Sequence, residues 1–137
     1  MIEIKKLYKS FGDLTVFDGA SIKVEDGQSL VVMGKSGQGK SVLLKLITRL
    51  LYPDSGNIYI DGEDLGTLNP NQLVKCRLKF GMLFQSAALF DSLNICDNVG
   101  IGLKAKNQFS DSEIETKVQE SLERVGLVDV GQKFPAQ

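Results

Sequence analysis

The sequence predicts an α/β fold with an antiparallel β portion at its amino-terminal end. Apolar and charged residues alternate at 2–7 and again at 22–25, as in strands that bury one face. A continuous apolar run at 29–33 leads directly into a glycine-rich loop and an amphipathic helical pattern. Mainly helical patterns follow in the last third of the chain. Half-buried strands and a fully buried strand, with helices between and after them, define the α/β class.

The amino-terminal elements are two strands joined by a turn. We expect the first strand at 2–7 and, after a turn at 10–13, a second extended stretch at 16–24. The dipeptide Asp26-Gly27 is a strong hairpin-turn signal. The run at 29–33 does not alternate, which is typical of a strand buried on both faces of a parallel sheet.

The middle of the chain alternates helices and strands. Apolar residues at helical spacing predict a helix over 42–51 that Pro53 stops. A short strand at 57–62 is expected to end in a turn, and a short helix is expected at 70–75. Another apolar strand is predicted at 80–84.

Two further helices are predicted in the last part of the sequence. The first covers 94–103 and is interrupted by glycines. The second covers 110–125, where Ser110-Asp111-Ser112-Glu113 resembles a capping box. Gly126 supplies the carboxyl-terminal stop of this helix. The sequence shows no internal repeat and no low-complexity tract.

Composition excludes several classes of function. The 137 residues include 16 Lys and Arg against 17 Asp and Glu, a net charge of −1, whereas nucleic-acid modules need a concentrated basic face. Histidine is absent, which excludes Ser-His-Asp and Cys-His catalytic systems and the commonest zinc sites.

The sequence has no recognisable membrane-spanning or secretory signal, and we expect a soluble, cytoplasmic chain. No apolar run approaches the ~20 residues that span a bilayer, and the amino-terminal segment lacks the apolar core of a signal peptide. Cys76 and Cys96 have no CxxC or histidine companion and indicate free thiols in a reducing compartment. We therefore expect no direct membrane insertion and no nucleic-acid partner.

The glycine-rich loop is the strongest functional signal. It fits the spacing Gly-x-x-x-x-Gly-Lys-Ser, and the candidate phosphate-binding residues are Gly34, Lys35, Ser36, Gly37, Gln38, Gly39, Lys40 and Ser41. The glycines let backbone amides turn inward around phosphate oxygens, and Lys40 adds a positive charge. The Ser41 hydroxyl is a hard oxygen ligand suited to Mg²⁺, and the helix that follows points its first amides at the same anion. The pattern predicts a site for a nucleoside triphosphate.

The residues around the loop narrow the family. Pro-Asp-Ser-Gly-Asn-Ile at 53–58, then Asp61-Gly62 and Phe84-Gln85, resemble in this order the nucleotide-binding domain of ATP-binding-cassette (ABC) proteins. The resemblance implies a P-loop ATPase core with an antiparallel β subdomain, and ATP and Mg²⁺ as cofactors. It also implies that Phe11 stacks on adenine and that Gln85 is a catalytic residue that reaches the Mg²⁺ and the attacking water. Taken alone, Phe11 equally fits a core aromatic, and Gln85 fits a solvated loop amide.

The segment after Gln85 refines the resemblance. Gly-Met-Leu-Phe-Gln-Ser-Ala-Ala-Leu-Phe-Asp-Ser-Leu at 81–93, followed by Asp97-Asn98-Val99, looks like the ATPase subunit of Mla-type (Mce-associated) phospholipid or lipid transporters. This implies a cytoplasmic subunit, peripheral to the membrane, that pairs with a second nucleotide-binding subunit and drives lipid transport. Its separate permease would dock in a groove after Gln85. The ATPase subunit of another ABC importer and a soluble ABC protein are the alternatives.

The resemblance covers the amino-terminal half of a cassette. We expect 1–137 to be part of one nucleotide-binding domain, with the β subdomain and P-loop core at 1–85 and the start of the helical subdomain at 86–137. The family's signature motif, the Walker B strand with its magnesium-binding Asp, the catalytic Glu and the switch His have no counterpart here. The resemblance therefore implies nucleotide binding without efficient hydrolysis. The central sheet is expected to be incomplete, which leaves 31–33 and 80–84 with exposed edges or faces that favour self-association.

Overall fold

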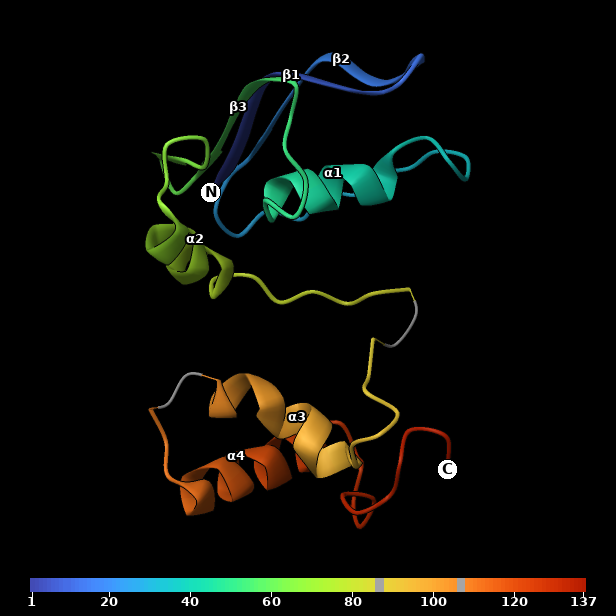
Figure 1. The fold of residues 1–137 in the computed structure, drawn as a ribbon, viewed down its shortest axis with the longest axis vertical. Helices are drawn as coiled ribbons and strands as arrows, with labels where there is room; N and C mark the ends of the chain where they lie inside the picture. Colours follow the sequence, from blue (N-terminus) through green and yellow to red (C-terminus); the bar gives the residue numbers. More distant parts are fainter. Residues whose placement is uncertain (86–87, 106–107) are drawn as a thin grey trace. The chain divides into compact units, whose positions relative to one another are not determined.

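The chain folds as two compact units. The computed structural model describes residues 1–85, 88–105 and 108–137, and the units are Met1–Met82 and Leu83–Gln137. Figure 1 shows the strands and the first two helices in the first unit, and the last two helices in the second. The subdomain boundary expected after residue 85 stays a prediction.

A four-stranded antiparallel sheet forms one layer of the first unit, in the order β2-β1-β3-β4. Its strands are β1 (Ile2–Phe11), β2 (Leu14–Val24), β3 (Ser55–Ile60) and β4 (Glu63–Asp64). The strands predicted from alternation are confirmed. The turns around Gly12 and at Asp61-Gly62 are confirmed as well, with both glycines at positive φ.

The core of this unit lies between the sheet and two helices, α1 (Lys40–Ile47) and α2 (Pro70–Arg77). Figure 1 shows α1 lying along one face of the sheet. The buried residues are Ile4, Leu7, Leu43, Leu46, Ile58, Ile60, Leu65 and Cys76. Cys76 is a free thiol, and burial raises its pKa. The predicted helix at 70–75 is confirmed and begins with a capping box at Asn69 and Gln72.

Helix α1 is shorter at its carboxyl end than the predicted 42–51. Arg49 adopts φ 56, a left-handed conformation that ends the helix. The amides of Leu50 and Leu51 then donate to the Lys45 carbonyl at 2.8 and 3.0 Å. These bonds satisfy a carbonyl of the last turn, so the helix stops before Pro53 is reached.

The two continuous apolar runs do not form strands, which corrects the sequence prediction. Residues 29–33 and 80–84 have no regular structure, and Val31 and Leu83 are 76% and 100% exposed. A strand exists only when its backbone pairs with a neighbour, and neither run pairs with another described segment. For the same reason Asp26-Gly27 forms a turn but not a hairpin. The expected exposure of these runs is observed, whereas self-association stays a prediction.

The second unit is a pair of helices, α3 (Ile95–Lys104) and α4 (Asp111–Arg124), around the small core of Ile114, Val118 and Leu122. Both predicted helices are confirmed. So is the capping box, in which Ser110 N donates to Glu113 Oε2 at 2.8 Å. Gly126 adopts φ 74 and ends α4 as predicted. Within the described ranges, no helix has the length and apolar character needed to cross a bilayer.

Candidate nucleotide-binding site

The glycine-rich loop leads into α1 and lies directly against β2. Gly37 and Gly39 adopt φ 83 and φ 90, a left-handed conformation that glycine enters without steric cost. A Cβ on Gly39 would lie 2.3 Å from Val16 Cγ1 and 3.5 Å from the Phe17 ring. Glycine at position 39 therefore lets the loop and the strand pack together. Sequence reasoning missed this contact, because nothing local to Val16 indicates a partner in the loop.

Helix α1 begins without a side-chain cap. Its N-cap residue is Gly39, which offers no capping side chain, and its first turn contains no acidic residue. Asn69, Asn94 and Ser110 cap α2, α3 and α4. An uncapped start leaves the first amides without partners, and the helix dipole adds positive potential there. The start of α1 therefore suits an anion with several acceptor oxygens, such as a phosphate group.

Lys40 spans the loop that precedes it. Its Nζ donates to the carbonyl oxygens of Gly34 and Lys35, both at 2.7 Å. An ammonium has three donors, so one N–H remains for a ligand. Gln38 also ties the loop, because its Oε1 accepts from the Lys35 amide at 2.8 Å. The loop thus holds its shape through its own contacts while most of its residues stay exposed.

Ser41 is the loop residue that fits a magnesium ion. It is exposed in the first turn of α1, beside Lys40, and Mg²⁺ prefers hard oxygen ligands. One hydroxyl is not a complete site, and within the part of the chain that the structure describes no cluster of three His, Cys, Asp or Glu side chains could hold a metal. The donor set therefore fits a Mg²⁺ whose other ligands are water and phosphate oxygens, as Mg²⁺ bound with nucleotides usually has.

Phe11 is not a core aromatic. It lies at the end of β1 and is 46% exposed, with Lys9 Nζ 5.2 Å from the centre of its ring. This exposure removes the competing interpretation of Phe11 and leaves part of its side chain accessible to a ligand. A separate hollow of about 420 Å³ lies between the start of β2 and the loop, lined in part by Thr15 and Gln38. Adenine stacking on Phe11 stays a prediction.

Gln85 lies in the second unit, in an exposed stretch without regular structure. The structure therefore gives no contact between Gln85 and the loop, and its metal and water contacts stay predictions. One argument for it is also weakened, since the run before it is not a buried strand. Ser86 and Ala87, in the same predicted segment, lie outside the described residues.

Asn98 organises the segment that follows Gln85. Its Oδ1 accepts from the Phe90 amide at 2.8 Å, and its Nδ2 donates to the carbonyls of Phe90, Leu93 and Asn94, each at 3.0 Å. Leu89 and Phe90 are held with 48% and 56% of their surface exposed. Sequence analysis gave Asn98 no role, because a single amide in a helix has no local signature.

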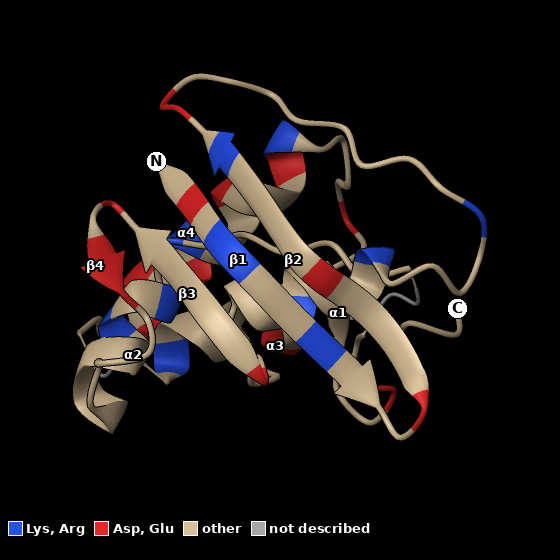
Figure 2. Cartoon of the chain, turned by 90° about the horizontal axis from the view of Figure 1, so that it is seen from above, with Lys and Arg blue, Asp and Glu red and all other residues tan. Residues whose placement is uncertain are grey.

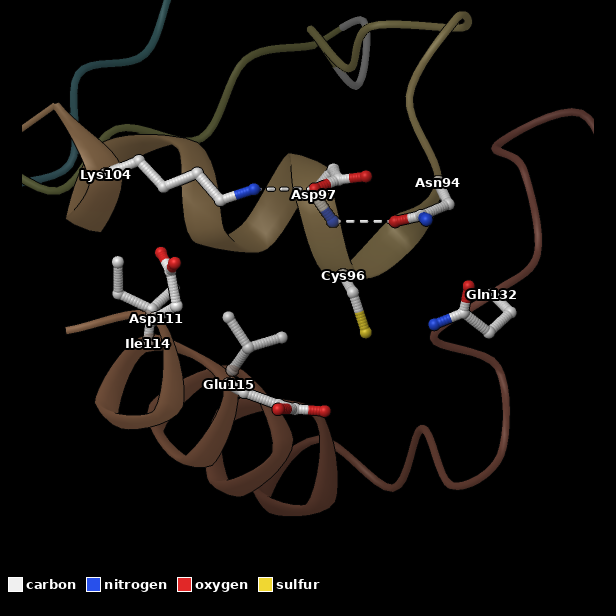
Figure 3. A pocket seen from close by; sticks show the side chains of 9 residues that line it. Asn94, Cys96, Asp97, Lys104, Asp111, Ile114, Glu115 and Gln132 are labelled. Carbon is white, nitrogen blue, oxygen red and sulfur yellow. Dashed lines mark hydrogen bonds and ion pairs between the residues drawn. The ribbon is translucent and has the colours of Figure 1, made fainter.

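A second cavity, of about 400 Å³, lies between α3 and α4 (Figure 3). Lys104 Nζ donates to Asp97 Oδ1 at 2.7 Å along one wall. Asp111 and Glu115 of α4 add two further carboxylates to the lining. With three carboxylates and one ammonium, this cavity has the charge opposite to that of the start of α1. It does not fit a triphosphate.

Known proteins resemble the chain along its full length. The family described as ABC transporter matches residues 17–137. The Arabidopsis thaliana protein TRIGALACTOSYLDIACYLGLYCEROL 3, chloroplastic, is 39% identical over 137 residues, which are 100% of this chain and 39% of that protein. Methionine import ATP-binding protein MetN 2 of Pseudomonas entomophila is 40% identical, over 100% of this chain and 42% of that protein. A probable ribonucleotide transport ATP-binding protein, mkl, of Mycobacterium leprae is 40% identical, over 99% and 39%.

Solved structures show the same fold. A dimeric structure of a post-hydrolysis state of the ATP-binding cassette MJ0796, bound to ADP and Pi, matches with a TM-score of 0.88 and 28% identity. A dimeric structure of MJ0796 as a bacterial ABC transporter cassette matches with a TM-score of 0.89 and 29% identity. Each match covers 100% of this chain and 62% of the solved chain. The chain therefore spans well under half of these curated relatives and less than two thirds of the solved cassettes.

Proposed function

Because the chain belongs to the ABC transporter family, we propose that it is the ATP-binding part of a subunit that couples MgATP binding and hydrolysis to transport. Transport itself takes place in a separate membrane permease. The observation that supports this best is the start of α1, where an uncapped helix that begins with Lys40 follows the glycine-rich loop. Together they offer free amides, a helix dipole and an ammonium to one anionic group.

Each candidate residue has a distinct task in this proposal. The amides of 34–41 and the Lys40 ammonium hold the β- and γ-phosphates. Ser41 and Gln85 hold the Mg²⁺, which when bound would neutralise charge on the phosphate oxygens. Phe11 stacks on the adenine, and Gln85 also orients the attacking water. The exposure of Phe11, Ser41 and Gln85 supports these roles, since each side chain is accessible to a ligand.

The partners follow from the same family. We propose a second nucleotide-binding subunit across the nucleotide, supported by the dimeric state of the solved cassettes. We propose a permease as the second partner, docked on the segment after Gln85, where Leu89 and Phe90 are exposed. The subunit then works at the cytoplasmic face of a membrane without entering it.

Hydrolysis by these 137 residues alone is expected to be negligible. Asp54 accepts from Lys9 Nζ at 2.6 Å and from the Ser10 amide at 2.7 Å, and these bonds lower its pKa. The Lys79 ammonium, with help from the amino terminus, lowers the pKa of Asp61 to about 2. A general base works best with a pKa near the working pH, so Asp54 and Asp61 are poorly suited to activate water. The family resemblance gives that task to a Glu that has no counterpart among these residues. Phosphate release at saturating MgATP should stay far below the ~1 s⁻¹ of ordinary enzymes.

We propose a phospholipid or other lipid as the transported substrate. The segment at 81–93 supports this through its likeness to Mla-type ATPase subunits, and the Arabidopsis relative is named after a galactolipid. The ATPase of another importer is the second candidate, because the methionine import and ribonucleotide transport proteins are equally similar. Transport assays on the whole transporter, with labelled phospholipid and labelled methionine side by side, separate these two.

Nucleotide binding is tested by isothermal titration of MgATP into the full chain. Lys40→Ala should abolish binding, because it removes the ammonium that the motif places on the phosphates and adds no side chain that could block them. Lys45→Ala is the matched control, since Lys45 is an exposed lysine on the same helix outside its first turn. Unchanged affinity in Lys40→Ala would overturn the proposal.

A further inference from the structure

The outer face of the sheet contains a hollow that is separate from the nucleotide site. Its volume is about 540 Å³, and its lining includes Lys5, Lys6, Ser21, Ser55 and Gly56. Figure 2 looks onto this face, with α1 behind the sheet, and shows lysine positions along β1 between β2 and β3. The hollow thus opens where three strands meet, on the side away from the core.

A bulge in β1 turns two lysines toward this hollow. Ile4 and Leu7 are 2% and 0% exposed, and the two residues between them, Lys5 and Lys6, are both exposed. Regular alternation would place one outward residue between two buried ones. The register shifts between Ile4 and Leu7 against β2, and between Lys5 and Tyr8 against β3. The bulge therefore re-aims the extra side chain outward, as bulges near binding sites do.

Lys6 is held in a strained conformation from both sides. Its φ of 47 is in the left-handed region, which a lysine rarely adopts. On one side, Ser21 Oγ accepts from the Lys6 amide at 2.9 Å. On the other, Gly56 comes so close that a Cβ there would lie 2.2 Å from the Lys6 carbonyl oxygen. Strain that neighbouring strands enforce in this way clusters at ligand sites.

The hollow offers donors and little competing negative charge. Lys5 is paired with Glu3 at 3.0 Å, whereas Lys6 makes no ion pair with any residue that the structure describes. The Ser21 hydroxyl accepts from the Lys6 amide and keeps its own hydrogen to donate. Ser55 adds a second exposed hydroxyl at the start of β3. One ammonium and two hydroxyl donors match the acceptor oxygens of a phosphate group.

We propose that this hollow binds a phosphate group, with Lys6 as its charge and Ser21 and Ser55 as its hydrogen-bond donors. The site is distinct from the loop at 34–41 and does not depend on nucleotide binding there. Inorganic phosphate and the phosphate of a phospholipid headgroup share this chemistry. The bulge is explained by this role, since without it only one lysine would face the hollow.

The first experiment titrates inorganic phosphate into the full chain with the Lys40→Ala substitution, which weakens the loop site, and follows backbone amide shifts by NMR at constant ionic strength. Saturable shifts are expected at Lys6, Ser21 and Ser55. They should weaken at least tenfold in apparent affinity when Lys6→Gln is added, and stay when Lys23→Gln is added instead. No saturable shift at these amides, or equal binding with Lys6→Gln, would overturn the proposal.

A second variant guards against a folding defect. Lys6→Gly suits φ 47, because glycine enters this region freely. It should therefore raise the thermal stability of the chain while it removes phosphate binding. Phosphate binding that survives in a stable Lys6→Gly chain would also overturn the assignment.

Vesicles distinguish the two phosphate sources. The chain is sedimented with phosphatidylcholine vesicles that contain about a third of the anionic lipid phosphatidylglycerol. Pure phosphatidylcholine, in which the choline cation balances the phosphate charge, is the control. Sedimentation that Lys6→Gln removes assigns the site to a lipid headgroup. Phosphate shifts without sedimentation assign it to soluble phosphate. MgATP affinity of the chain with Lys40 intact is measured in parallel, so failure of this site stays distinct from failure of the nucleotide site.

Discussion

Helices α1 and α4 begin in opposite ways. Helix α4 starts with a reciprocal capping box between Ser110 and Glu113 and has two acidic residues in its first turn. Helix α1 starts on Gly39, with no side-chain cap and no acidic residue. Both helices bury aliphatic side chains against their own core, so packing does not explain the difference. Helix α4 has the capping residues that stabilise a helix start. Helix α1 lacks them, and its first amides lie next to the glycine-rich loop.

Giving α1 the acidic start of α4 should have the largest effect. Ser41 and Ser112 are both the second residue of their helix. Ser41→Asp should reduce MgATP affinity by at least about 100-fold, or about 2.7 kcal/mol, because a carboxylate repels the phosphates and removes the hydroxyl ligand. Thermal stability should not fall, since an acid suits a helix start. Ser112→Asp is the matched control and should leave affinity unchanged. Equal affinities in both variants would contradict the contrast.

The sequence was sufficient to predict elements that local signals define. The capping box at Ser110 and the stop at Gly126 depend on neighbours in sequence, and the structure has them as predicted. The strand expected at 2–7 also forms, but it extends to Phe11 and its alternation breaks at a bulge. The runs at 29–33 and 80–84 were assigned wrongly, because continuous hydrophobicity shows that a segment needs burial but not that a pairing partner is present. Local pattern cannot supply that partner.

Some features of the candidate site could likewise be predicted from local sequence, and others depend on contacts between distant residues. The loop at 34–41 could be predicted because phosphate binding requires these residue types at this spacing along the chain. The contact of Gly39 with Val16 could not, since it joins residues far apart in sequence. The position of Gln85 relative to the loop is likewise a long-range property, and its role depends on the family resemblance alone. The sequence therefore predicts the residues that bind phosphate, but not the contacts that bring distant parts of the site together.

Phe11 tests whether the nucleotide site extends from α1 to the β1–β2 hairpin. Phe11→Ala should weaken ATP binding by roughly 1–3 kcal/mol, the range of base–aromatic stacking. GTP should lose a similar amount, because stacking does not distinguish the bases. Phe134→Ala is the control, since Phe134 is equally exposed at 45% but lies in the second unit. If titration shows no loss with Phe11→Ala, the base binds elsewhere, with Tyr8 or Phe17 the next candidates.

Removing the cap of α4 should lower stability without touching nucleotide binding. Ser110→Ala deletes the hydroxyl that accepts from the Glu113 amide, and loss of such a cap costs about 1 kcal/mol. Chemical denaturation followed by circular dichroism measures the loss, and titration of MgATP measures the affinity. A drop in affinity would mean that the two helix starts are coupled, and the contrast between them would no longer hold.

The smallest expected effect is a loss of stability in acid, which should arise at the start of α4 and not at the start of α1. Bonds from the Ser110 amide and hydroxyl to the Glu113 carboxylate lower the pKa of Glu113 below its model-peptide value of 4.5. A folded-state pKa below the unfolded one stabilises the fold fully above pH 4.5, and that share is lost as pH falls through the lower value. Denaturation midpoints of the parent chain and Glu113→Gln, compared between about pH 6 and pH 3, isolate this share, because glutamine keeps the capping box without titrating. The stability advantage of the parent chain over Glu113→Gln should therefore shrink as the pH falls. A gap that stays constant with pH would show that the Glu113 charge adds nothing to the cap, and that the acidic start of α4 is not what separates it from α1.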